Sequence, residues 1–365
     1  MMPGLKTHLH LKKIKMKTYI TLLGVIITNS LFACDFCGCF MGITPYDNHS
    51  SISAMYRYKM FNGYQNMNQH HNVFQKSAFS NSASQNTLAN PYSNYNTLKH
   101  GNNGSANVEP PPQQYLQSDY ELYTTAEVRA KIFIHKRIEL NAIIPFVMNS
   151  SRTEDRKEQA SGISDLTFFT GFHLINRTMT EKFQHRLILG GGIKLPVGHY
   201  YMKNDGYRIN FLLQPGTGSI DYMAYMNYVF GYKKLGVNFM SSYKVNGDNY
   251  YKERIANSTT NYLNVFYKFR QEKDLKIFPS VQGYYEYTKG LYINKVYQIG
   301  TEMDVATAGL GLDIFYKQVS INTAFHLPVY EKRFDGNLAT AGKFMVGLTY
   351  SFNQKKYLLK SKKES

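Results

Sequence analysis

The sequence predicts a closed antiparallel β-barrel of about twelve strands that crosses a membrane. Three observations predict it: apolar and polar residues alternate with a period of two, the alternating segments are long, and their connections are long and short in turn. The clearest alternation is FMVGLTYSF at 344–352, where one face carries Phe, Val, Leu, Tyr and Phe. Because helical periodicity is lacking, no second layer covers these apolar faces; lipid can cover them, and closure removes the unpaired strand edges.

Twelve segments show this alternation, and their length favours strands that cross a bilayer. Most run about 10–13 residues, against about five or six in soluble sheets. A strand tilted by about 45° needs only about 9–11 residues to cross. In chain order the expected strands are 51–61, 120–134, 137–148, 163–175, 185–197, 219–230, 234–244, 260–270, 275–288, 304–316, 318–328 and 342–352.

The connections alternate in a way that is typical of bacterial outer-membrane barrels. After the odd-numbered strands they are long and polar, as in residues 62–119, 150–161, 198–218 and 245–259. After the even-numbered strands most are tight, as in HKR, YKK, QEKD and the single residue Lys317. Long loops at one rim and short periplasmic turns at the other are therefore expected. The first loop, 62–119, is low in complexity, and we expect it to be mobile.

Composition and charge point to a protein that lies beside lipid. The 365 residues include 31 Tyr, 23 Phe and no Trp, and only 18% are charged. Lys and Arg number 42 against 25 Asp and Glu, which gives a net charge of +17. Such a basic surface suits anionic outer-membrane lipid and lipopolysaccharide as partners. Nucleic acid is not expected as a partner, because the basic residues are scattered and no known binding motif occurs.

The N-terminus predicts export. A Lys-rich stretch is followed by the apolar segment TYITLLGVIITNSLFA, which is too short for a spanning helix and ends at Ala33 like a signal peptide. The last strand has Gly347, Tyr350 and Phe352 at the spacing of an insertion signal, so the barrel-assembly machinery is an expected partner. The expected domains are a signal peptide at 1–33, a periplasmic segment at 34–50, the barrel at 51–352 and a basic periplasmic tail at 353–365.

All three cysteines, Cys34, Cys37 and Cys39, lie at the start of the exported chain. Three interpretations stay open: lipidation of Cys34, a disulfide, or a thiolate site for copper or zinc. In the first loop, Met67, His70 and His71 form a weaker candidate for copper.

Polar faces of the expected strands would line the barrel lumen. Both signs of charge are present, which predicts salt-bridge ladders that stiffen the wall, with a few groups screening solutes. The candidate lumen-lining residues are Glu127, Arg129, Lys131, Asp165, His173, Arg186, Lys194, Asp221, Lys244, Lys268, Arg270, Glu286, Asp313 and His326.

Prolines and glycines mark two irregular places in the strands. Pro145, Pro196 and Pro328 lie near the expected outer ends of three odd-numbered strands. Proline cannot donate to a strand ladder, so these positions predict either local bulges or a weakened seam through which an apolar solute could pass laterally. The run Gly190–Gly192 predicts a bend or the close approach of another part of the chain.

Several blocks resemble a known family. GISDLTFF (162–169), LGGGIKLPVGHYY (189–201) and LQPGTGSIDYM (213–223) resemble the phenol-degradation-type transporter family of Gram-negative outer membranes. CGCFMGITPYDNHS (37–50), followed by YRYKMFNGY (56–64), is similar to a subgroup of this family that begins with a cysteine cluster. The resemblance covers most of the exported chain. It implies an outer-membrane channel without catalytic residues and names no substrate.

The sequence thus favours an outer-membrane channel or transporter for a small solute, with no required cofactor. In the more specific version of this hypothesis the solute is hydrophobic or aromatic. The alternative is a metal-linked uptake protein that uses the cysteine cluster with copper or zinc. A barrel with a purely structural role is a further alternative. An enzyme is not expected, because the His-x-Ser-Asn-Gly motif of outer-membrane lipases is missing. His135, His173, His185 and His326 also fall on different strands without an evident Ser or acid partner.

Overall fold

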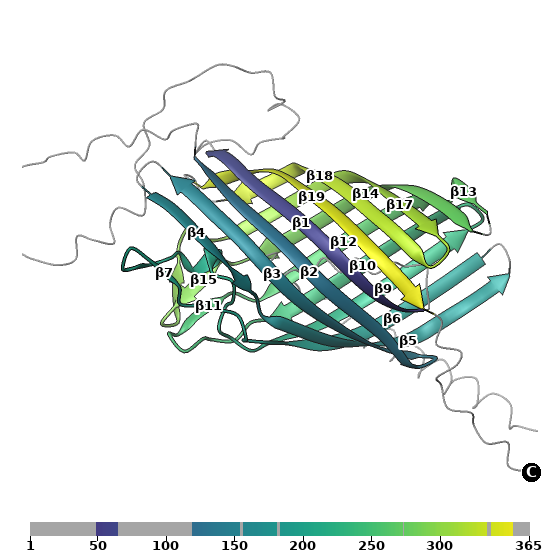
Figure 1. The fold of residues 1–365 in the computed structure, drawn as a ribbon, viewed down its shortest axis with the longest axis horizontal. Coiled ribbons are helices and arrows are strands. Elements are labelled where there is room, and N and C mark those ends of the chain that lie inside the picture. Colours follow the sequence, from purple (N-terminus) through teal and green to yellow (C-terminus); the bar gives the residue numbers. More distant parts are fainter. Residues whose placement is uncertain are drawn as a thin grey trace, which may run out of the picture.

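The chain forms a closed barrel of twelve antiparallel strands, as predicted (Figure 1). The computed structural model describes residues 49–64, 119–153, 156–180, 183–272, 274–333 and 337–352. Each barrel strand pairs with its neighbours along the chain, β1 pairs with β19, and the pairing of β12 with β14 completes the ring. The barrel strands are β1 (Ser50–Tyr64), β2 (Tyr120–His135), β3 (Ile138–Thr153), β5 (Leu166–Thr180), β6 (Phe183–Leu195), β9 (Asp221–Tyr232), β10 (Leu235–Val245), β12 (Ser258–Tyr267), β14 (Leu275–Thr288), β17 (Met303–Tyr316), β18 (Val319–Arg333) and β19 (Leu338–Phe352).

Short turns and long connections lie at opposite rims. The short-turn rim also holds the beginning of β1 and the end of β19, where Ser50 pairs with Phe352. The other rim, at the left of Figure 1, carries several small elements. These are β4 (Arg156–Ile163), β7 (Lys203–Asn204), β8 (Tyr207–Arg208), the 3-10 helix η4 (Phe211–Leu213), β11 (Glu253–Ile255), β15 (Leu291–Ile293) and β16 (Val296–Gln298). Within the described ranges, no helix is long and apolar enough to cross a membrane.

The structure corrects the predicted connections at three places. Residues 150–153 and 156–161 pair as parts of β3 and β4 instead of forming a loop, because backbone pairing can continue above a bilayer without an apolar face. β18 and β19 likewise extend to Arg333 and Leu338, so the predicted long eleventh connection is short. β12 ends at Tyr267, because the amide of Phe269 turns back to the Tyr267 carbonyl at 2.8 Å.

The outer surface of the barrel carries an apolar belt. Large side chains such as Ile52, Val128 and Leu310 point outward and are 53%, 52% and 69% exposed. Tyrosines stand near both ends of the strands, and Tyr222 and Tyr232 on β9 are ten residues apart. At a rise of about 3.3 Å per residue and a tilt of about 45°, this separation spans about 23 Å, close to the about 25 Å of an outer-membrane apolar band.

Inside the wall, Tyr225 lies flat against glycines of the neighbouring strands. A Cβ atom on Gly190 would lie 2.2 Å from Cε1 of Tyr225 and 2.3 Å from the Thr170 carbonyl oxygen. The glycine run predicted as a place of close approach therefore accommodates an aromatic ring from β9, which is paired with β6.

We expect Gly190→Ala to destabilise the barrel by about 1–3 kcal/mol, since the added methyl group overlaps both a ring and a backbone oxygen. The temperature at which the folded band disappears on a detergent gel measures the effect. Gly283→Ala is the matched control, because a Cβ atom on Gly283 meets nothing within 4 Å. Equal temperatures for the two variants would contradict this packing.

Candidate solute site in the barrel lumen

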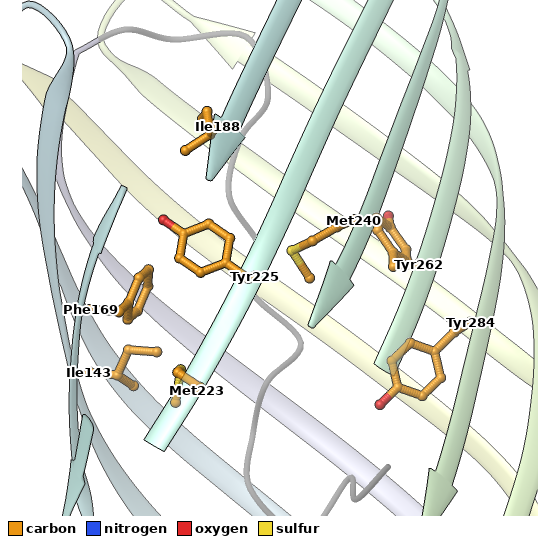
Figure 2. Packing of buried hydrophobic residues seen from close by; sticks show 8 residues of the cluster. All are labelled: Ile143, Phe169, Ile188, Met223, Tyr225, Met240, Tyr262 and Tyr284. Atoms are coloured by element: carbon orange, nitrogen blue, oxygen red, sulfur yellow. The ribbon is translucent and has the colours of Figure 1, made fainter. Parts of the chain in front are cut away.

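One half of the lumen wall is apolar at mid-height. A cluster of eight buried side chains runs from β3 around to β14 (Figure 2). Its members are Ile143, Phe169, Ile188, Met223, Tyr225, Met240, Tyr262 and Tyr284. Phe169 and Tyr225 meet edge to face, with ring centroids 5.7 Å apart. A side of the lumen lined in this way suits an apolar or aromatic solute.

Charged side chains line the part of the wall that β1, β2, β14 and β19 form. On β1 and β2, Glu127 accepts a hydrogen bond from Arg57 at 2.8 Å and forms an ion pair with Arg129. Glu286 of β14 is fully buried, and its carboxylate lies 3.6 Å from Lys59 Nζ and 3.3 Å from Lys343 Nζ. β14 and β19 are separated by two strands in the sheet, so the Glu286–Lys343 pair reaches across the lumen.

Strand register arranges these groups in two neighbouring rows. Asn238 pairs with Asn264, and Asn264 with Gln282. Gln282 pairs in turn with Gly309, and the pairing continues from there to His326, Lys343 and Lys59, which gives a polar row. Two residues away along each strand, and therefore on the same face, Met240 pairs with Tyr262, and Tyr262 with Tyr284. A polar row and an apolar row thus run side by side across β10, β12 and β14.

Two cavities toward the outer rim are lined by charged and apolar side chains together. A cavity of about 120 Å³ is lined by Arg57, Lys59, Phe169, Met223 and Pro215, among others. A neighbouring cavity of about 100 Å³ is lined by Lys59, Tyr284, His326 and Lys343 with adjacent residues. These cavities offer charge and aromatic surface together.

The connection between β6 and β9 folds into the mouth of the barrel. Ile209 and Leu213 are 2% and 1% exposed and pack with Ala160 of β4. Asn149, on the lumen face of β3, donates a hydrogen bond from its side-chain amide to the Leu213 carbonyl at 3.0 Å. Residues 196–220 therefore form a plug in the mouth, called the plug loop below.

Asp165 anchors the plug loop. Its carboxylate accepts hydrogen bonds from the backbone amides of Gly198 at 3.0 Å and Thr217 at 2.9 Å. It also binds Lys194 Nζ at 2.7 Å, and Lys194 lies 2.9 Å from Asp221. Asp165, Lys194 and Asp221 are all buried, so each charge depends on the others for compensation.

A second contact joins the plug loop to the neighbouring outer loop. The Arg208 guanidinium forms a two-point ion pair with Glu253 of β11, and one of its nitrogens donates to Glu253 Oε2 at 2.7 Å. This hydrogen bond raises the pKa of Arg208. Arg208 also lies over the rings of Tyr201 and Tyr251, which stack with centroids 4.3 Å apart. The mouth is thus covered by two loops that hold each other.

The predicted lumen-lining residues can now be placed. All but one are buried: Glu127, Arg129, Lys131, Asp165, His173, Arg186, Lys194, Asp221, Lys244, Lys268, Glu286, Asp313 and His326. Arg270 is the exception, since it is exposed in β13 (Arg270–Gln271) and pairs with Glu272 at 2.8 Å. The turn after Tyr267 ends the alternation that the prediction for Arg270 assumed.

Sequence reasoning missed an acid partner and three cations. His173 Nε2 lies 3.0 Å from the Glu139 carboxylate, although no acid partner was expected for this histidine. Alternation within 51–61 and 342–352 would have placed Arg57, Lys59 and Lys343 on the polar face, had it been followed residue by residue.

The candidate metal ligands lie outside the described residues: Cys34, Cys37, Cys39, Met67, His70 and His71. The predicted signal peptide and basic tail, and most of the predicted first loop, also lie outside them. Among the residues that the structure does describe, no group of three or more His, Cys, Asp and Glu side chains could hold a metal ion.

Comparison with known proteins finds similarity in structure but not in sequence. No family model and no curated protein sequence matches the chain. An outer-membrane channel from Pseudomonas putida F1 superposes with a TM-score of 0.57 at 12% identity, over 83% of this chain and 96% of the channel. The β domain of the Bordetella autotransporter BrkA gives 0.43 at 7% identity, over 84% and 100%, and LpxR from Salmonella typhimurium gives 0.36 at 10%, over 83% and 100%. The likeness to the Pseudomonas channel shows the fold of this chain, a closed β-barrel of the outer-membrane type.

Proposed function

We propose that the protein is an outer-membrane channel that passes a small apolar or aromatic solute toward the periplasm. The observation that carries the proposal is a break in the barrel wall, where residues of a groove outside and of the cavity inside come close together. Gly162 lines the outer groove, Pro215 lines the lumen cavity, and a Cβ atom on Gly162 would lie 3.5 Å from Pro215 Cγ.

The wall breaks because β3 changes partners at Pro145. Up to Ile143 it pairs with β5, and from Phe146 onward it pairs with β4. The amide of Ser164, between β4 and β5, donates to the Pro145 carbonyl at 2.9 Å. β6 ends at Leu195, just before Pro196, and within the described part of the chain β4 has β3 as its sole strand partner. The second edge of β4 therefore faces the plug loop instead of another strand.

The groove at this break is apolar. Ile144, Ile163 and Val197 line it and are 50%, 54% and 52% exposed, and Met202 lies at its edge. An apolar solute dissolved in the outer leaflet could reach this groove directly, and the lumen cavity behind it offers Phe169 and Met223. This supports lateral entry of an apolar solute, the sharper interpretation of the proline positions.

The outer membrane is the compartment that we propose, because the apolar belt and two tyrosine levels fit its thickness. Lipid and lipopolysaccharide would be partners of the belt, and the barrel-assembly machinery would insert the chain. In this proposal residues 1–33 serve as the signal peptide, and no cofactor takes part.

Conductance of the purified protein in a planar bilayer tests the proposal. We expect discrete steps smaller than those of a porin of about 16 strands in the same membrane, because side chains and the plug loop narrow the lumen. A small neutral aromatic such as benzyl alcohol should close these steps. If the bilayer shows no conductance steps and vesicles containing the protein take up no aromatic solute, the barrel has a structural role only.

A further inference from the structure

We propose that the solute carries a carboxylate on an aromatic body, and that Lys59 and Lys343 bind this carboxylate within the lumen. The inference rests on the proposed channel function and names its substrate class. The residues on which the inference rests lie on β1, β14 and β19. They line the cavity of about 100 Å³ described above, which contains Lys59, Tyr284 and Lys343 in its wall.

The two lysines already hold a carboxylate. Glu286 Oε2 lies 3.6 Å from Lys59 Nζ and 3.3 Å from Lys343 Nζ, so their geometry suits one carboxyl group between two ammonium groups. Glu286 is 0% exposed, whereas Lys59 and Lys343 retain 15% of their side-chain surface. The lysines therefore still face the cavity after Glu286 has been accommodated.

Positive charge exceeds negative charge around this cavity. Arg57, Lys59 and Lys343 line it, and its described lining holds no Asp or Glu. In a narrow, weakly screened lumen this excess attracts an anion and repels a cation.

Aromatic surface lies in contact with the same lysines. Lys343 Nζ lies 4.1 Å from the centroid of the Tyr284 ring, and Lys59 Nζ lies 5.0 Å from that of Phe61. From Tyr284 the apolar row continues to Tyr262 and Met240. A carboxylate at the lysines would therefore place an attached ring on this row, with its charge toward the polar row. A neutral aromatic molecule gains only the contact with the apolar row. An aromatic ammonium ion is repelled by the two lysines.

Block of single-channel current by three aromatic probes of similar size tests the assignment: benzoate, benzyl alcohol and benzylammonium. For the wild-type protein we expect benzoate to block at a concentration about tenfold or more below that of benzyl alcohol, and benzylammonium to block least. In Lys59→Gln/Lys343→Gln this preference for benzoate should disappear, while block by benzyl alcohol stays the same.

Glu286→Gln provides a test of opposite sign. It removes the resident carboxylate and leaves both lysines in place, so benzoate should block at a lower concentration than in the wild type. The matched control for charge is Lys295→Gln/Lys332→Gln, two exposed lysines outside the plug loop, which should keep the wild-type order of the probes. If the lumen double variant fails to fold, as judged by its mobility on a detergent gel, Glu286→Gln decides.

The outcomes separate the two proposals. Steps that benzoate and benzyl alcohol block equally, with no change in Glu286→Gln, would overturn the carboxylate site and leave the channel standing. If no variant conducts and vesicles containing the protein take up none of the probes, the channel function itself fails. A benzoate preference that survives Lys59→Gln/Lys343→Gln would also overturn the assignment, because the carboxylate would then be bound elsewhere.

Discussion

A disulfide between cysteines introduced as Gly162→Cys and Pro215→Cys is expected to stop entry of aromatic solute, and a reducing agent is expected to restore it. A Cβ atom on Gly162 lies 3.8 Å from Pro215 Cβ, within the about 3.5–4.5 Å that a disulfide spans. The bond would join a residue that lines the outer groove to a residue that lines the lumen cavity. Uptake of a small aromatic into vesicles should therefore fall to the level of empty vesicles under oxidising conditions.

The experiment is best made in a background in which Cys34, Cys37 and Cys39 are serines, so that no other thiol competes. Each single cysteine variant serves as a control and should transport equally well with and without the reducing agent. If the oxidised double variant transports the solute as well as its reduced form does, the solute does not pass between β4 and the plug loop. Entry along the barrel axis would then be the better explanation.

The barrel could be predicted from the sequence because its strands obey a local rule. Alternation of apolar and polar residues places one face toward lipid wherever it occurs, so all twelve strands were located within a few residues. The β3–β4 hairpin was missed for the same reason. Above the bilayer, residues such as Glu158 and Gln159 no longer need to alternate between apolar and polar, because backbone hydrogen bonds can continue the pairing without an apolar outer face.

The candidate site was only partly predictable. Alternation indicates that Glu286 faces inward, but not that it meets Lys343 from across the lumen, because that contact depends on the curvature of the closed sheet. The fold of the plug loop has no periodic signal at all. Its position depends on Asp165, which a strand pattern identifies as a polar residue without revealing that two loop amides bind it.

Asp165→Ala should release the plug loop and increase single-channel conductance several-fold. The substitution removes the acceptor of the Gly198 and Thr217 amides and one of the two carboxylates that compensate Lys194. Breaking such a buried network by removal of one partner costs about 3–5 kcal/mol, which is comparable to the about 1.5–3 kcal/mol that burial of each of Leu213 and Ile209 contributes. The variant barrel should also unfold at a lower temperature on a detergent gel.

Limited digestion with trypsin follows the plug loop directly. Arg208 is held by Glu253 in the wild-type protein, so cleavage after Arg208 should be slow there and fast in Asp165→Ala. Asp165→Asn keeps one acceptor oxygen and should lie between the two. Asp248→Ala is the surface control: its carboxylate is 35% exposed and lies 3.6 Å from Arg254, a pair expected to contribute about 0–1 kcal/mol. If Asp165→Ala and Asp248→Ala conduct and digest alike, the plug loop is held by its packing and not by this carboxylate, and opening of the mouth would have to be sought at the Arg208–Glu253 pair instead.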